Sequence, residues 1–121
     1  MQYLCLVYQD EKILNSLSRS EYDQLVTDAL AYSDELEASG HLVSANALEL
    51  VECATTIRTG SGRMTTTDGP FAETREQLGG YYLIEARDLN EAIRLAAKIP
   101  SAILGCIEVR PVKNLLDGRR L

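Results

Sequence analysis

The fold is decided by residues 68–100, which read DGPFAETREQLGGYYLIEARDLNEAIRLAAKIP. The segment opens with a tight-turn signal, because Gly69 tolerates backbone angles that are strained for other residues and Pro70 fixes its own φ. Residues 81–86 follow as an apolar run, which predicts a strand buried on both faces. Asp88 then supplies an N-cap for a helix that the closing proline must end. A turn, a buried strand and a capped helix in this order are typical of a small α+β domain.

Upstream of this segment, the pattern predicts one strand and one long helix. Residues 3–8 form a second continuous apolar strand, and residues 9–15 are predicted to be a polar loop. Ser18 and Glu21 match a capping box, and Gly40 is expected just past the helix end. Between them, one apolar stripe recurs at helical spacing: Tyr22, Leu25, Val26, Ala29, Tyr32 and Leu36.

The remaining strands complete a known order. Residues 42–50 and 105–112 are predicted strands, and residues 55–58 and 64–67 predict a polar hairpin around residues 60–62. Without the hairpin the order is βαββαβ, a ferredoxin-like α+β protomer. Two helices cover only one face of such a sheet, yet its strands are apolar on both. We therefore expect a homodimer in which two sheets face each other, a dimeric α/β barrel.

Composition limits the class of protein and its partners. The chain has 121 residues, predicted to form one domain over residues 1–121, with residues 113–121 as a loose tail. Its formal net charge is −6, and the chain lacks the excess of positive charge that binds a phosphate backbone, so no direct nucleic-acid partner is expected. No apolar run is long enough for a membrane span. Three cysteines without a close pair predict a reducing, cytoplasmic setting, and no metal spacing or phosphate-binding loop is found, so no metal or cofactor is expected.

The stretch from Asp68-Gly69-Pro70-Phe71 to Ile84 closely resembles the DGPF-type branch of the YCII-related proteins. The resemblance extends upstream to residues 1–4 and downstream over residues 92–111, and so covers essentially the whole chain. It implies a dimeric α/β barrel of ferredoxin-like protomers in the bacterial cytoplasm. Genes for such proteins often neighbour, or are fused to, genes for extracytoplasmic-function sigma factors.

The resemblance implies less about activity. Some YCII-related relatives resemble lyase-type enzymes that act on small cyclic substrates, with a His–Asp pair for acid–base work. Where those relatives carry a histidine at the start of the first helix, this chain has Glu21-Tyr22, and its one histidine, His41, follows that helix. The His–Asp mechanism therefore does not carry over, and only Asp68 matches a family active-site carboxylate.

The candidate site is built around that carboxylate. Asp68 is the candidate general acid or base, Phe71 and Tyr82 form an apolar wall, and Glu73 and Arg75 orient polar groups of the substrate. The alternative interpretation makes Asp68 a turn residue whose carboxylate accepts backbone N–H groups. In that interpretation the charged residues after it form a solvated turn with ion pairs of little energetic value.

Two functions remain open from the sequence. The first is a lyase- or isomerase-like enzyme that uses Asp68 as acid–base on a small organic substrate. The second is a non-catalytic small-molecule sensor or accessory protein associated with extracytoplasmic-function sigma factor signalling. His41 is expected to be a surface residue that complements the helix C-terminus, because a lone histidine there has no catalytic partner in the pattern.

Overall fold

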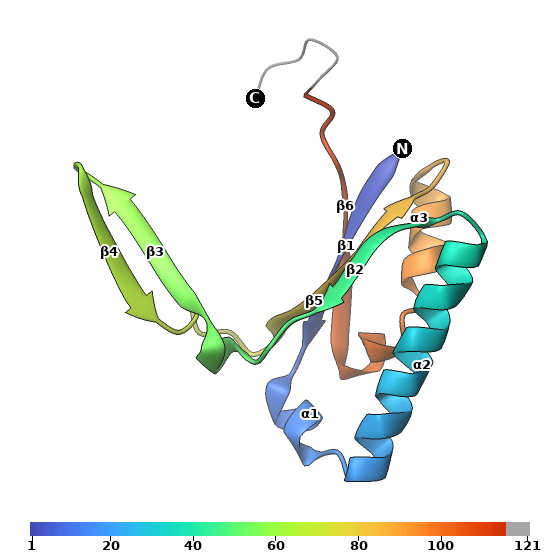
Figure 1. Ribbon diagram of the computed structural model, residues 1–121, viewed down its shortest axis with the longest axis horizontal. Coiled ribbons are helices and arrows are strands. Elements are labelled where there is room, and N and C mark those ends of the chain that lie inside the picture. The colour runs from blue at the N-terminus through green and yellow to red at the C-terminus, as the bar shows by residue number, and fades with distance from the viewer. Residues whose placement is uncertain (116–121) are drawn as a thin grey trace.

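The computed structural model describes residues 1–115 and is built on a four-stranded antiparallel sheet (Figure 1). The strands are β1 (Gln2–Gln9), β2 (Leu42–Ala47), β5 (Gln77–Glu85) and β6 (Gly105–Pro111), in the spatial order β2-β5-β1-β6. This is the ferredoxin-like order. Each of the two central strands of the sheet, β5 and β1, has an antiparallel neighbour on both sides. The expected ferredoxin-like α+β protomer with an inserted hairpin is confirmed. Residues 113–115 carry no helix or strand, and the rest of the predicted tail lies outside the described residues.

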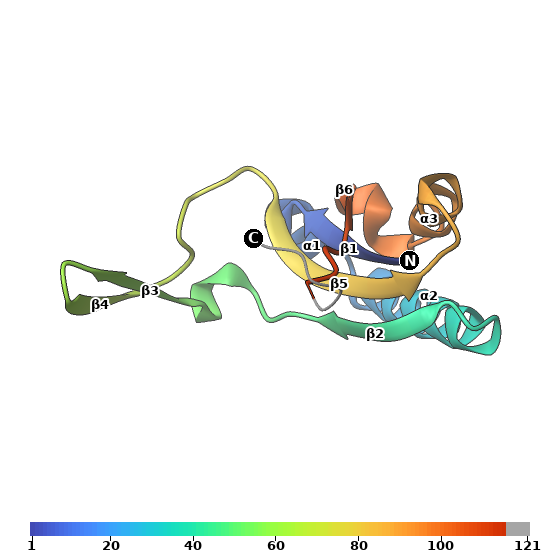
Figure 2. The ribbon, with the colours of Figure 1, turned by 90° about the horizontal axis from the view of Figure 1, so that it is seen from above.

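Two helices cover one face of the sheet (Figure 2). They are α2 (Arg19–Ala38) and α3 (Leu89–Ala96). The predicted capping box is present, because the Ser18 hydroxyl accepts the Glu21 N–H at 3.1 Å and the Glu21 carboxylate accepts the Ser18 N–H at 2.8 Å. Asp88 caps α3 in the same way, by accepting the Glu91 N–H at 2.9 Å. Local capping chemistry thus fixes where both helices begin.

Helix α2 ends just before Gly40, as predicted from the position of this glycine in the sequence. Gly40 has φ of +80°, which is strained for residues with a Cβ. The Gly40 N–H donates to the Glu37 carbonyl at 3.0 Å, and the His41 N–H donates to the Leu36 carbonyl at 2.8 Å. This is a Schellman motif, and it turns the chain directly into β2.

The two central strands, β1 and β5, are apolar on both faces, but only one face is covered within residues 1–115. On the other face the edge strands carry Ser44, Asn46, Glu108 and Arg110 beside them. On the helix side, Tyr3, Cys5 and Val7 of β1 alternate into the core. The core is completed mainly from β5, α2 and α3, by Tyr82, Ile84, Tyr32, Leu36, Ala92 and Ala96. The opposite side, here called the open face, carries five partly exposed side chains on the two central strands: Leu4, Leu6, Tyr8, Tyr81 and Leu83.

Three boundaries differ from the sequence-based expectation. Residues 9–15 are not a loop throughout, because Asp10 caps a short helix, α1 (Glu11–Ser16), by accepting the Lys12 N–H at 2.9 Å. Strand β2 ends at Ala47, short of the predicted residue 50. Strand β5 begins at Gln77 and includes Gly79 and Gly80, because these glycines let the neighbouring Gln9 side chain and Asn46 backbone approach closely. A short 3₁₀ turn, η1 (Val51–Cys53), follows β2, and a second, η2 (Pro100–Leu104), precedes β6.

The predicted hairpin is confirmed and projects away from the sheet (Figures 1 and 2). It consists of β3 (Thr55–Gly60) and β4 (Arg63–Asp68), joined at Ser61 and Gly62, both with positive φ. We call residues 55–68 the arm. Within residues 1–115, no helix or other strand packs extensively on either of its strands.

Candidate functional site

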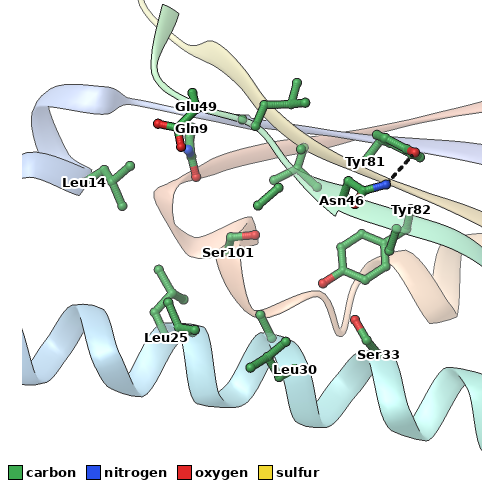
Figure 3. Close-up of a pocket in the computed structure, with 18 of the residues that line it drawn as sticks. Gln9, Leu14, Leu25, Leu30, Ser33, Asn46, Glu49, Tyr81, Tyr82 and Ser101 are labelled. Atoms are coloured by element: carbon green, nitrogen blue, oxygen red, sulfur yellow. Dashed lines mark hydrogen bonds between the residues drawn. The ribbon is translucent and has the colours of Figure 1, made fainter. Parts of the chain in front are cut away.

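A groove of about 410 Å³ lies between α2 and the helix side of the sheet (Figure 3). It exists because α2 is buried only at Tyr32 and Leu36, in its C-terminal half. The N-terminal half keeps apolar side chains uncovered, with Leu30 64% exposed. The apolar lining comes from four parts of the chain: Val7, Leu14, Leu25, Val26, Ala29, Leu30, Ala45, Ala47, Leu48 and Leu50.

The groove has one pair of hydroxyl groups at its inner wall. Tyr82 comes from β5 and is only 8% exposed, and its ring points toward Ser33 of α2 (Figure 3). Burial raises the pKa of Tyr82, and the hydrogen bond with Ser33 opposes this effect only in part. The phenol therefore remains protonated at neutral pH and can donate a hydrogen bond to a ligand oxygen.

The rest of the groove offers few charged groups. Among its described lining residues Glu49 is the one carboxylate. Neutral polar groups come from Gln9, Tyr22, Asn46, Tyr81 and Ser101. Apolar walls with a few fixed polar groups are typical of sites for small organic molecules. The arrangement can desolvate a ring and orient one oxygen-bearing substituent on it.

The structure places the predicted site residues in two regions. Tyr82 lies in the groove. Asp68 is the exposed last residue of β4, and Phe71, 77% exposed, follows it on the connection to β5. Glu73 is exposed on the same connection, and Arg75 lines a separate polar depression beside α1. The described protomer does not bring these five side chains into one cavity.

The turn interpretation of Asp68 is wrong. Its carboxylate accepts no hydrogen bond within residues 1–115, whereas an Asx-turn requires one from a nearby backbone N–H. The turn is held by backbone instead, since the Gly69 N–H donates to the Ala54 carbonyl at 2.7 Å. Gly69 has φ of +104°, which favours glycine at this position. The conformational part of the turn signal was therefore correct, and the carboxylate part was not.

Neither Ser33 nor the groove was predicted from the sequence. The apolar stripe of α2 was assigned to the core, although its N-terminal half lines an open cavity. A helix stripe looks the same in sequence whether a sheet or a ligand covers it. The polar Ser33, which lies one residue past the buried Tyr32, was the one local signal of a change in surroundings.

Two further polar clusters lie on the sheet and at the end of α2, and Tyr81 and Asn46 of the first cluster also line the groove. On the open face the Tyr81 hydroxyl bonds with Asn46 at 2.9 Å and Ser44 at 3.2 Å, and these bonds lower the pKa of Tyr81. At the end of α2, His41 bonds with the Ser39 hydroxyl at 2.7 Å and lies 3.6 Å from Glu91. The His41 side chain is 25% exposed, so it is not the fully exposed surface residue that was expected, and it lies between the end of α2 and α3.

Other chemistries find little support in the described part of the chain. Burial raises the pKa of the Cys5 thiol to about 11, which makes it a core residue rather than a nucleophile. Within residues 1–115 no cluster of three or more histidine, cysteine or acidic residues is placed to hold a metal ion. None of the described helices combines the length and apolar character needed to cross a membrane.

The fold and the groove together define a class: a ferredoxin-like protein of the dimeric α/β-barrel type with a mainly apolar groove beneath its long helix. Residues 1–116 match the YCII-related domain, and the chain belongs to the YCII-related family. The assignment from the DGPF-type residues is thereby confirmed.

Two known proteins are similar over their full length. Uncharacterized protein R00369 of Rhizobium meliloti (strain 1021) is 36% identical over 120 residues, which cover 98% of this chain and 97% of that protein. The structure of 5-chloro-2-hydroxyhydroquinone dehydrochlorinase (TftG) from Burkholderia phenoliruptrix AC1100, in complex with 2,5-dihydroxybenzoquinone, superposes with a TM-score of 0.55. It is 16% identical, with 98% of this chain and 100% of that chain covered. At this identity the likeness concerns the fold alone.

Proposed function

We propose that this protein binds a small organic molecule, with an apolar ring and at least one oxygen substituent, in the groove between α2 and the sheet. One observation carries the proposal: the Tyr82 and Ser33 hydroxyls face each other inside a cavity whose lining is mainly apolar. A ring would gain from the apolar walls, and its oxygen would accept from the buried phenol.

A lyase- or isomerase-like reaction on that molecule is the catalytic form of the proposal. In this form Asp68 transfers the proton, Tyr82 and Phe71 form the apolar wall, and Glu73 and Arg75 orient polar groups. The dehydrochlorinase activity named for the structural neighbour supports a lyase-type reaction on a hydroxylated ring. Since Asp68 lies outside the groove of its own protomer, this form requires a second copy to bring the carboxylate to the bound molecule.

A non-catalytic sensor or accessory protein, linked to extracytoplasmic-function sigma factor signalling, is the second candidate. It is favoured because Glu49 is the one carboxylate among the described lining residues of the groove, which leaves the protomer without a paired acid and base there. For both candidates we propose a homodimer in the cytoplasm. The uncovered open face supports the dimer, and three free thiols, two of them exposed, fit a reducing compartment.

Titration with 2-naphthol, a neutral ring compound with one hydroxyl group, tests the binding proposal. Calorimetry on the wild type should show one site per chain. Ala29→Phe fills the groove from the helix side and should weaken binding at least tenfold. Thr27→Phe places the same ring on an exposed part of α2 that does not line the groove, and it should bind like the wild type. Equal binding by both variants would contradict the groove as the site.

The catalytic form has its own measurement. Wild type and Asp68→Asn are incubated with 5-chloro-2-hydroxyhydroquinone, and chloride release is followed. Release by the wild type that falls at least a hundredfold in Asp68→Asn would support acid–base catalysis by Asp68. Binding of the compound without chloride release by the wild type would favour the sensor instead.

A further inference from the structure

The arm carries an uncovered apolar face. Thr59 is paired with Met64, and Ile57 lies two residues before Thr59 on β3, so Ile57 and Met64 point to the same side of the ribbon. Their exposed fractions are 61% and 67%. Two large apolar side chains at one place on a thin polar ribbon mark a contact surface.

A two-stranded ribbon is marginally stable by itself in water. The body of the protein gives the arm little support, because within residues 1–115 β3 and β4 pack extensively only on each other. Yet its sequence is rich in the β-branched residues that strands favour when they pack on something: Thr55, Thr56, Ile57, Thr59, Thr65, Thr66 and Thr67. The ribbon is thus well suited to be a strand pair packed against another surface.

The root of the arm is fastened to the body. The Glu11 carboxylate accepts the Val51 N–H at 3.0 Å on the way into the arm. The Glu11 N–H donates to the Gln77 side chain at 3.0 Å, where the chain returns into β5. The Thr56 hydroxyl also donates to the Gly69 carbonyl at 2.8 Å, across the base. Glu11 of α1 therefore holds the segments that lead into and out of the arm, which projects from the body (Figures 1 and 2).

Charge indicates the kind of surface that the arm fits. Its second face carries Arg58 and Arg63, and no acidic residue precedes Asp68 within it. The chain as a whole has a net charge of −6. Helix α2 presents one basic residue, Arg19, against six exposed acidic ones: Glu21, Asp23, Asp28, Asp34, Glu35 and Glu37. A second copy of this chain therefore offers an acidic surface beside uncovered apolar side chains, which complements the arm.

We propose that the arm packs its Ile57–Met64 face on a second copy of this chain, and that the positive charge of Arg58 and Arg63, on the other face, attracts the arm to the acidic surface of that copy. Asp68 and Phe71, at the base of the arm, then belong to an interface between copies, which accounts for their having no cavity in the protomer. This inference goes beyond the proposed function and does not depend on what the groove binds.

Sedimentation equilibrium tests the arm directly. Wild type should dimerise in the micromolar range, and Ile57→Ser with Met64→Ser should raise the dissociation constant at least tenfold. Thr65→Ser with Thr67→Ser, on the opposite face, is the matched control and should leave it unchanged. Arg58→Glu with Arg63→Glu should also weaken the dimer, most strongly at low salt. A monomeric wild type, or a dimer indifferent to Ile57 and Met64, would overturn the proposal.

Photo-crosslinking from position 64 provides a second measurement. Met64→p-benzoylphenylalanine should capture another copy, and the linked peptide should come from the region of α2. Crosslinks confined to the same chain would contradict the inference. The 2-naphthol titration of the Ile57 and Met64 variant separates the two proposals, because an intact groove binds the probe whether or not the arm is engaged.

Discussion

At the residue scale, Asp68 is an exposed carboxylate that accepts no hydrogen bond within residues 1–115. Asp68→Asn should therefore change the free energy of unfolding by no more than about 0.5 kcal/mol, as expected for surface positions without a specific partner. Urea denaturation at a concentration where the chain is monomeric measures it. Ser18→Ala removes a true cap and should cost about 1 kcal/mol in the same assay. A comparable loss in Asp68→Asn would restore the turn interpretation.

The Glu91 carboxylate of α3 interacts with His41, which precedes β2, and with Arg87, which precedes α3. The carboxylate accepts the Arg87 N–H at 2.9 Å and lies 3.2 Å from the Arg87 guanidinium and 3.6 Å from His41. The backbone hydrogen bond from Arg87, helped by nearby positive charges, lowers the pKa of Glu91 from its usual value of 4.5. The ionised carboxylate is therefore favoured in the folded state.

This shift predicts a pH dependence of stability. Because the folded pKa of Glu91 lies below the unfolded one, its contribution is fully present above pH 4.5 and is lost as pH falls through the folded value. The stability difference between wild type and Glu91→Gln should thus persist from pH 7 to about 5 and shrink toward pH 3. Denaturant midpoints across this range measure it. A difference that grows as pH falls below 4.5 would contradict the assignment.

Among the helices, capping residues predicted the first residue of α2 and of α3, whereas hydrophobic periodicity predicted only that a helix is present. Ser18, Glu21 and Asp88 placed the starts of α2 and α3, because a cap is a local bond between near neighbours in the chain. The periodicity of α2 predicted its existence but not its surroundings. Whether its N-terminal half meets the sheet or lines a groove depends on how β2 and η2 approach it, which no local pattern records.

Strand β6 offers a test of close packing between elements. A Cβ on Gly105 would lie inside the contact distance of the Tyr8 carbonyl of β1, and neither backbone can move without disturbing the ladder. Gly105→Ala should therefore cost on the order of 2 kcal/mol, as for overpacked sites. Gly60→Ala, at the arm tip, meets no atom within 4 Å and should have little effect. Thermal unfolding of both variants checks the difference, and equal midpoints would count against it.

At the scale of the whole molecule, the strand and helix order was sufficient to predict the topology. The order βαββαβ with right-handed crossovers leaves few alternatives, and the observed sheet β2-β5-β1-β6 is the expected one. The site was predicted less well. Phe71, Glu73 and Arg75 were grouped with Tyr82 because they are close in sequence, yet they lie on the connection between arm and sheet, away from the groove. Spatial grouping across a projecting hairpin depends on tertiary and intermolecular contacts that sequence proximity does not encode.

The open face leads to the last prediction, which concerns the assembly of two sheets. Leu4, Leu6, Tyr8, Tyr81 and Leu83 form a continuous apolar surface on the central strands, and only apolar cover compensates such a surface in water. Leu6→Asp places a charge at its centre, while the core side of β1 stays unchanged. We expect a folded monomer in sedimentation equilibrium at concentrations where the wild type is dimeric, because burial of an unpaired carboxylate between two sheets is strongly unfavourable.

Thr27→Asp, on the exposed side of α2, is the matched control and should remain dimeric. The double variant of Ile57 and Met64 distinguishes the two surfaces. If the sheets form the main interface and the arm adds to it, Leu6→Asp abolishes the dimer, whereas the arm variant only weakens it. A Leu6→Asp protein that dimerises like the wild type would show that the arm, and not the sheet, holds the two copies together. The open face would then need a different cover.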